Sequence, residues 1–353
     1  MGAASNTPFL RDCGALGTCR FSSRQRTVTI YSTQSFERDS LRLANANRHH
    51  LQLLAAGLSA NTTPLAQASK AISIFTDDTV SAPVLKQLWS HGVRYLVLRA
   101  TGHENLDLEA AHRLGLRVAN VPDCSPHATA EYAVALILAL CRHLRQADLQ
   151  VRANDFCLDE LIGFNLHGKT VGILGVGRIG AAVARILHGF GCNVIGYDVQ
   201  PNETFRHVEW LQYVTLPELC AQADIITVHT PLNGESKHLI NDKLLASMKH
   251  GVLLVNTGRG GVLDTAAAVR ALESGQLGFL GLDVYEGEKG LFFVNHSLDQ
   301  LRDKTFARLL NFKNVLVTGH QAYLTREALT NIADATVACF DAWEQGLDAK
   351  NEL

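Results

Sequence analysis

A glycine-rich turn near the middle of the chain limits the possible folds more than any other feature. An apolar run that begins after Gly168 leads into Gly175-Val176-Gly177-Arg178-Ile179-Gly180, and apolar residues then recur at helical spacing as far as Phe190. This order predicts a strand, a tight turn and a helix, followed by a second strand from Cys192 to Tyr197. Such a unit is typical of a parallel α/β sheet.

The three glycines, and the acid after the second strand, indicate dinucleotide binding. We expect Gly175 to permit the sharp turn, Gly177 to leave room for a pyrophosphate at the backbone, and Gly180 to allow close packing of helix and strand. The pyrophosphate would lie at a helix N-terminus, where N–H groups and the helix dipole favour negative charge. Asp198 follows the second strand, where an acid accepts the adenosine ribose hydroxyls and repels a 2′-phosphate. A bare glycine pattern can be purely structural, but the flanking elements here agree, so we predict NAD rather than NADP as the cofactor.

Length and composition indicate a globular protein of two domains. The chain has 353 residues, of which 47% are hydrophobic and 19% charged. Its longest strongly apolar run, Ala133–Cys141, is too short to cross a bilayer. The net charge of -2, without a dense basic run, gives no support for a nucleic-acid partner. We therefore expect neither a membrane nor a nucleic acid as a partner.

The cysteines and histidines favour no metal site. The eight cysteines are scattered without a CxxC pair, which is typical of free thiols in a reducing compartment, and the fifteen histidines include no HExxH motif. We predict no metal cofactor and a soluble intracellular protein in the cytoplasm.

Residues 1–26 carry four arginines and several serines against one acid, so a plastid or mitochondrial transit peptide, a disordered extension and a start-site artefact remain open alternatives.

Strand and helix patterns alternate on both sides of the glycine turn. Ahead of it, strands are predicted at 28–32, 50–55, 71–76, 95–99 and 117–121, with helices at 36–46, 62–68, 82–91 and 106–114. After it, helices are predicted at 216–222, 242–248 and 265–274, with strands at 224–230, 252–257, 277–284 and 315–318. Alternation with short connections predicts βαβ units around parallel sheets that are covered on both faces.

Two further helices and an irregular stretch complete the predicted organisation. A helix from about His127 to Arg152 is apolar nearly all round, so we expect it between domains or subunits, and a last helix from about Arg326 to Gln345 is expected to return to the first domain. The irregular stretch at 285–303 is long enough to suggest a function. The predicted fold class is α/β with two doubly wound parallel-sheet domains. A Rossmann NAD-binding domain at 126–320 is inserted into a flavodoxin-like substrate domain formed by 27–125 and 321–353, with the substrate in the cleft between them.

Three polar residues that follow predicted strands are candidates for catalysis. Hydride transfer between a carbonyl and a nicotinamide needs a proton donor for the oxygen and a cation that polarises it and holds a substrate carboxylate. Arg259 in VNTGRGG, Glu288 in DVYEGE and His320 in TGHQA fit these needs at the sheet edge where α/β proteins bind ligands. Alternatively, Arg259 is a surface arginine, His320 a structural histidine and Glu288 a solvated acid. Paired with one ring nitrogen of His320, Glu288 would fix the tautomer and favour the protonated ring that acts as the acid.

At these positions the chain resembles the D-isomer-specific 2-hydroxyacid dehydrogenases, and within them the fermentative D-lactate dehydrogenase branch. The resemblance spans about Thr27 to Gln345 and rests on the ordered motifs LRATGHENLDLEAA, NVPDCSPHATAEYAVA, GKTVGILGVGRIG, HTPL, VNTGRGG, GLDVYEGEKGLFF and TGHQAYLTREAL. It implies reduction of pyruvate to D-lactate by hydride transfer from NADH, with His320 as general acid/base. It also implies a homodimer built largely through the cofactor domains.

The resemblance further implies a role for each matched residue. Arg259 would bind and polarise the substrate, Glu288 would pair with His320, the backbone N–H groups of Thr101 and Gly102 would hold the substrate carboxylate, and Tyr323 would border the pocket. The implied cofactor-binding residues are Gly175, Gly177, Arg178, Ile179 and Gly180 at the pyrophosphate, Asp198 at the ribose, Thr230 and Pro231 beside the adenosine half, Ser236 near the cofactor, Thr257 and Arg259 near the nicotinamide ribose, and Asp283 at the carboxamide.

Two positions depart from the family pattern. Cys124 stands where relatives often have a tyrosine that can touch the substrate, so the acyl pocket would be wider than in a strict pyruvate enzyme. Ser236 stands where relatives commonly have asparagine, from which we expect slightly altered NAD affinity. The wider pocket leaves open a broader D-2-hydroxyacid dehydrogenase that reduces other 2-ketoacids. The resemblance also leaves open an NADH-sensing, corepressor-like scaffold, as some family members are.

Overall fold

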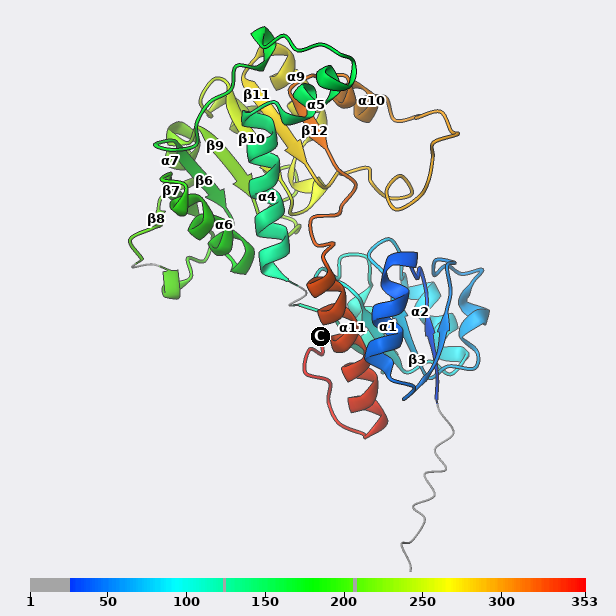
Figure 1. Ribbon diagram of the computed structural model, residues 1–353. Helices are drawn as coiled ribbons and strands as arrows, with labels where there is room; N and C mark the ends of the chain where they lie inside the picture. The colour runs from blue at the N-terminus through cyan, green and yellow to red at the C-terminus, as the bar shows by residue number, and fades with distance from the viewer. Residues whose placement is uncertain (1–25, 123–124, 206–207) are drawn as a thin grey trace, which may run out of the picture.

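The computed structural model describes residues 26–122, 125–205 and 208–353, which form two α/β lobes, each built around a parallel sheet (Figure 1). This confirms the predicted fold class. The predictions made for the N-terminal extension and for Cys124 fall on residues outside the described ranges, except for Arg26. In the described part of the chain, no helix is long and apolar enough to cross a membrane.

The first lobe holds a five-stranded sheet of order β2-β1-β3-β4-β5, in which every pair is parallel. Its strands are β1 (Thr27–Ile30), β2 (His50–Leu53), β3 (Ala71–Ile74), β4 (Tyr95–Leu98) and β5 (Arg117–Ala119), and its helices are α1 (Arg38–Asn45), α2 (Ala82–Ser90), α3 (Leu108–Arg113) and α11 (Arg326–Glu344). The segment predicted as a helix at 62–68 is a short 3-10 turn, Thr63–Ala66.

Helices cover both faces of this sheet because its strands are apolar on both sides. Leu96 and Leu98 of β4 pack with the core residues of α2 and α3, whereas Val97 between them packs with α1 and α11. The chain end is held here too, because Trp343 of α11 stacks on Tyr95 with ring centroids 5.0 Å apart. The C-terminal helix thus lies on the sheet formed by the first part of the chain, as Figure 1 shows.

The second lobe holds a seven-stranded parallel sheet of order β12-β11-β10-β9-β6-β7-β8. Its strands are β6 (Thr170–Leu174), β7 (Asn193–Tyr197), β8 (Gln212–Tyr213), β9 (Ile225–Val228), β10 (Val252–Asn256), β11 (Leu277–Leu282) and β12 (Val315–Val317). Its helices are α4 (Pro126–Cys141), α5 (Leu144–Arg152), α6 (Arg178–Gly189), α7 (Leu216–Gln222), α8 (Asp242–Ala246), α9 (Thr265–Ser274) and α10 (Lys304–Leu310). Helices α4 and α6 pack on one face, and α7, α8 and α9 on the other.

The predicted single helix from His127 to Arg152 is wrong. His143 has a left-handed backbone with a φ of 52°, which ends α4 and starts α5 in a new direction. The two pieces also differ in burial: nine residues of α4 are buried, whereas α5 has none. Only α4 is therefore the buried helix that the apolar pattern predicts. The sequence reading also missed α10 and the two-residue edge strand β8.

Candidate active site

The glycine turn joins β6 to α6 and has the geometry that a dinucleotide needs. Gly175 has a φ of +92°, and a Cβ there would lie 2.9 Å from the backbone of His229. A Cβ on Gly180 would collide with the carbonyl oxygen of Gly175, so only glycine allows this contact of helix and strand. A Cβ on Gly177 would meet nothing within 4 Å, which leaves the space in front of the turn open for a phosphate.

The helix end beside this open space can receive a pyrophosphate. Gly177 is the N-cap of α6 and has no side chain to accept hydrogen bonds from the first turn, which begins with Arg178 and Ile179. Asp198 follows β7 on the neighbouring strand. Its two carboxylate oxygens accept hydrogen bonds from the backbone N–H groups of Val176, at 2.8 Å, and Gln200, at 3.0 Å. The acid is thereby fixed beside the turn, where a ribose would lie.

Buried polar atoms without partners mark the rest of the cofactor path. The hydroxyls of Thr230 and Thr257 and the Nδ1 atom of His229 are inaccessible and make no hydrogen bond within the described residues. Such groups are costly unless a ligand supplies partners. Burial lowers the pKa of His229 to about 3, so its ring stays neutral. These residues fit NAD: a nucleotide along this edge would provide the missing hydrogen bonds.

Two residues with implied cofactor roles have structural partners of their own. Ser236 donates to the carbonyl oxygen of Pro231 at 2.6 Å and accepts from the N–H of Asn233 at 2.8 Å, so it closes its own loop. Asp283 is fully buried and accepts hydrogen bonds from Thr318 and from the backbone of the turn after β12. Their contacts with the cofactor stay predictions.

The three catalytic candidates follow three neighbouring strands. Arg259 comes after β10, Glu288 after β11 and His320 after β12, and β11 pairs with both of the others. Because all are parallel, their carboxyl ends lie at one edge of the sheet. The Arg259 loop packs against the β11 loop so closely that a Cβ on Gly260 would collide with the backbone of Tyr285.

His320 and Glu288 form a hydrogen-bonded pair. The Nδ1 atom of His320 lies 2.9 Å from Oε1 of Glu288, and the other carboxylate oxygen accepts the N–H of Tyr285 at 2.9 Å. Both side chains are partly exposed, at 18% and 26%. A carboxylate on Nδ1 fixes the ring and leaves Nε2 as the nitrogen that can exchange a proton with a substrate.

The backbone around His320 is unusual and is held by Asp283. His320 has a φ of +53°, which non-glycine residues rarely adopt. Its N–H donates to the Asp283 carbonyl oxygen at 2.7 Å. The Asp283 carboxylate accepts the N–H groups of Gln321 and Ala322 at 2.9 and 2.8 Å. A fully buried acid therefore fixes the position from which the imidazole is presented.

Arg259 extends from the second lobe to the first. Its Nη1 donates to the Gly258 carbonyl oxygen at 3.0 Å, and its Nε lies 3.2 Å from Oε1 of Glu104. Glu104 belongs to the loop after β4, which also contains Thr101 and Gly102. A Cβ on Gly102 would collide with the Arg259 guanidinium. The structure thus brings Arg259 to the loop that the resemblance assigns to the substrate carboxylate.

Three residues near the site were not singled out from the sequence. The Phe293 ring lies 5.7 Å from the imidazole of His320 and 5.3 Å from the ring of Phe75, so aromatic contacts join the two lobes beside the histidine. Tyr323, which the resemblance already placed at the pocket, has its ring centroid 6.4 Å from that of His320. Phe75 directly follows β3, so the strand-end argument could have found it. Glu104 and Phe293 lie within the motifs LRATGHENLDLEAA and GLDVYEGEKGLFF, but neither follows a strand directly, so the strand-end argument did not single them out.

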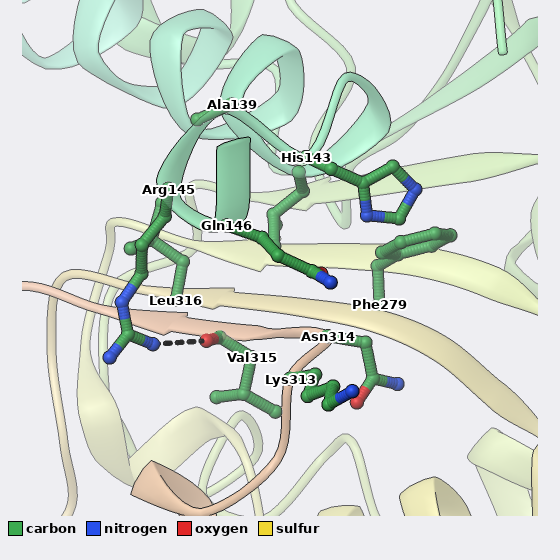
Figure 2. A pocket seen from close by; sticks show the side chains of 10 residues that line it. Ala139, His143, Arg145, Gln146, Phe279, Lys313, Asn314, Val315 and Leu316 are labelled. Carbon is green, nitrogen blue, oxygen red and sulfur yellow. Dashed lines mark hydrogen bonds between the residues drawn. The ribbon is translucent and has the colours of Figure 1, made fainter. Parts of the chain in front are cut away.

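A hollow in the second lobe lies away from this edge. Figure 2 shows His143, Arg145 and Gln146 around the break between α4 and α5, facing Phe279 and the residues that open β12. Arg145 donates to the carbonyl oxygen of Val315, the first residue of β12. Because it lies at the amino end of β12, this hollow is remote from the strand ends that carry the catalytic candidates. In the described part of the chain, no group of three or more His, Cys, Asp or Glu side chains is placed to hold a metal ion.

A nucleotide-binding turn at the same sheet edge as an acid–histidine pair and an arginine defines an NAD-dependent dehydrogenase. The family model for the NAD-binding domain of D-isomer-specific 2-hydroxyacid dehydrogenases matches residues 134–322, more than half of the chain. The chain belongs to the D-isomer-specific 2-hydroxyacid dehydrogenase family and is an oxidoreductase with NAD as its cofactor.

Similar proteins cover nearly the whole chain. A D-lactate dehydrogenase of Curvularia clavata is 44% identical over 331 residues, which are 92% of this chain and 94% of that protein. The structure of the pyruvate reductase of Chlamydomonas reinhardtii superposes with a TM-score of 0.87 at 40% identity, covering 93% of this chain and 98% of that one. A D-lactate dehydrogenase of Aquifex aeolicus, complexed with NAD and lactic acid, superposes with a TM-score of 0.81 at 31% identity, covering 90% and 96%. These likenesses agree with the resemblance that the motifs indicated.

Proposed function

We propose that this protein is an NAD-dependent D-lactate dehydrogenase that reduces pyruvate to D-lactate. The observation that carries the proposal is the His320–Glu288 pair, which lies at the same sheet edge as Arg259 and the nucleotide-binding turn after β6. Relatives whose names specify D-lactate dehydrogenase or pyruvate reductase, at 40–44% identity, support this substrate class. The same pair disfavours a purely NADH-sensing scaffold, which has no need of a proton donor.

Each residue has a physical task in this reaction. Bound NADH supplies the hydride to the substrate carbonyl carbon. Arg259 binds the carboxylate and polarises the carbonyl, which its planar guanidinium can do with two parallel hydrogen bonds. His320 donates the Nε2 proton to the carbonyl oxygen as negative charge develops there, and Glu288 stabilises the ring through Nδ1. In the reverse direction His320 takes the proton from the hydroxyl group.

The aromatic residues beside His320 favour a small acyl group. The ring centroids of Phe75 in the first lobe and Phe293 in the second lie 5.3 Å apart, and the Phe293 ring also contacts the imidazole of His320. A bulky 2-ketoacid would need to separate these rings. Activity assays of the purified protein with pyruvate, hydroxypyruvate, phenylpyruvate and branched 2-ketoacids test this point. We expect pyruvate to give the highest kcat/KM. A clear preference for a larger acid would replace the lactate assignment with the broader 2-ketoacid reductase.

A homodimer formed through the second lobe is also part of the proposal. Large apolar side chains are exposed along α5 and the segment that follows it, with Phe156 at 69%, Leu158 at 73% and Ile162 at 84%. Contiguous exposed apolar residues on a globular protein mark interaction surfaces. We propose that this face packs against the same face of a second copy, as C2 dimers do.

The cytoplasm is the compartment that we propose. The alternative of a plastid or mitochondrion rests on the arginines and serines of residues 1–26. Fractionation of cells that express the full chain with a C-terminal tag tests this proposal, and recovery in an organelle fraction would contradict it.

A further inference from the structure

The carboxylate-binding arginine already holds a carboxylate that belongs to the chain itself. The Nε atom of Arg259 lies 3.2 Å from Oε1 of Glu104, and the two side chains come from different lobes. They are only partly buried, with 31% of the Arg259 side chain and 40% of the Glu104 side chain exposed. This ion pair is therefore accessible from the site and can be broken by a ligand.

The position of the Glu104 carboxylate matches the position that a substrate carboxylate requires. A Cβ on Gly102 would collide with both Oε2 of Glu104 and Nη2 of Arg259, so the ion pair lies directly against the Gly102 backbone. The guanidinium and the amides of Thr101 and Gly102 are the groups that we assign to the substrate carboxylate. Glu104 thus presents the same functional group, with the same charge, to the same guanidinium, next to the Gly102 backbone.

A simple surface ion pair would not need this placement. Exposed ion pairs such as Arg113–Glu109, Arg117–Asp348 and Lys313–Glu160 stay within one lobe, whether their residues are near or distant in sequence. Arg259–Glu104 instead joins the two lobes, at the arginine that follows β10. Two carboxylates cannot use one guanidinium in the same geometry, so substrate and Glu104 must compete for Arg259.

We infer that Glu104 is an internal competitor of the substrate: it occupies Arg259 in the substrate-free protein and is displaced by the carboxylate of a 2-ketoacid. This inference rests on the proposed function of Arg259. An exposed ion pair is weak, so a substrate that gains further hydrogen bonds from backbone amides can displace Glu104. Glu104 would therefore set the substrate affinity of the enzyme without taking part in the chemical step.

The variant Glu104→Gln tests this inference because it removes the charge and keeps the shape. We expect a KM for pyruvate about threefold to fivefold lower, in line with a weak competing ion pair, and a kcat within about twofold of the wild type. Glu109→Gln, which removes the same charge from a more exposed position in helix α3 without touching the Arg259 pair, is the control and should change neither constant. An unchanged or increased KM in Glu104→Gln would overturn the inference.

A binding measurement separates this inference from the proposed function. Oxamate, a pyruvate analogue that is not reduced, can be titrated into the protein with NADH while the fluorescence of NADH is followed. We expect Glu104→Gln to bind oxamate more tightly by the same factor. This gain should vanish when Arg259→Gln is also present, because the guanidinium for which Glu104 and oxamate compete is then absent. A gain that persists in the double variant would also overturn the inference. If the wild type reduces pyruvate but Glu104→Gln changes neither the KM nor the affinity for oxamate, the proposed function stands and the role of Glu104 is rejected. If the wild type reduces no 2-ketoacid, the proposed function itself is rejected.

Discussion

The imidazole of His320 is held in place by contacts with other residues, because its backbone has a conformation that histidine rarely adopts on its own. Its left-handed backbone costs on the order of 1–3 kcal/mol, which the hydrogen bonds to buried Asp283 offset. Glu288 then fixes the ring through Nδ1. Backbone strain held by a buried acid is typical of residues whose exact orientation matters for function.

Replacing His320 by glutamine should separate proton donation from cofactor binding. We expect kcat for pyruvate to fall by roughly a hundredfold or more, because a positioned general acid contributes about 10²–10⁴ to the rate. NADH affinity should stay close to that of the wild type, since the nucleotide-binding turn is untouched. Steady-state kinetics and NADH fluorescence measure the two effects. His250→Gln, at an exposed position, is the control, and normal turnover in His320→Gln would end the assignment.

His229 gives the protein a predictable sensitivity to acid. Burial lowers its pKa from an ordinary value of 6.5 to about 3, so the unfolded chain takes up a proton below about pH 6.5 while the folded protein does not. The stability that depends on neutral His229 is therefore fully present above pH 6.5 and is lost as the pH falls toward 3. Between pH 7 and pH 5 this loss amounts to about 2 kcal/mol.

The variant His229→Gln tests this linkage. Urea unfolding at pH 7 and at pH 5 should show a smaller loss of stability in His229→Gln than in the wild type, whatever the stability of the variant at pH 7. His250→Gln should keep the wild-type difference because its side chain is exposed. Equal losses in His229→Gln and the wild type would show that His229 is not the group responsible.

The nucleotide-binding turn is an element in which each glycine has a different physical reason. Gly180 is required by the contact of α6 with β6, whereas Gly177 faces open space. One glycine of this short turn is therefore required for packing within the fold, and another is required to leave room for the ligand. Substitutions by alanine can distinguish the two.

Gly177→Ala and Gly180→Ala should fail in different ways. Gly177→Ala should keep the thermal stability of the wild type but bind NADH about tenfold or more weakly, since the added methyl group lies where the phosphate approaches. Gly180→Ala should lose roughly 1–3 kcal/mol of stability because the methyl group has no room. Gly189→Ala, in the last turn of α6 with nothing within 4 Å, is the control and should affect neither property. Calorimetry measures the stability and NADH fluorescence measures the binding. If Gly177→Ala binds NADH as tightly as the wild type, the phosphate lies elsewhere.

Local patterns predicted the elements well, and long-range contacts were the part that could not be predicted. Helices α7 and α9 begin and end at the predicted residues because capping residues and apolar spacing lie within the segment itself. The break at His143 depends on a single left-handed residue, and no neighbouring glycine or proline signals it. The strand-end argument found Arg259, Glu288 and His320. The contacts of Glu104 and Phe293 join distant residues across two lobes, so sequence periodicity carries no trace of them.

At the scale of the whole molecule, the site depends on both lobes. The second lobe supplies the nucleotide-binding turn and the His320–Glu288 pair, and the first supplies the loop of Thr101 and Gly102. Contacts between Arg259 and Glu104, between Phe75 and Phe293, and between Lys289 and Thr79 cross from one lobe to the other. A substrate that binds between the lobes would therefore replace existing contacts, and closure around it would exclude water.

The proposed dimer can be tested by placing a charge on the exposed apolar face. The wild type should sediment at about twice its chain mass of 38.4 kDa, whereas Ile162→Glu should shift toward the monomer because an unpaired carboxylate would be buried in the interface. Leu298→Glu changes a side chain that is 99% exposed in the irregular stretch and should leave the dimer intact. Analytical ultracentrifugation is the measurement. A monomeric wild type would contradict the proposed dimer, and an Ile162→Glu variant that remains dimeric would place the interface on another face.

The central claim is that the strand ends of the second lobe form a centre for stereospecific reduction of a 2-ketoacid. The most direct test is to follow the loss of NADH absorbance with pyruvate and to separate the lactate formed on a chiral column, for the wild type and for His320→Gln in parallel. We predict rapid oxidation of NADH with D-lactate as the product, and little of either in the variant. L-lactate as the product, or no oxidation of NADH with pyruvate, would contradict the account.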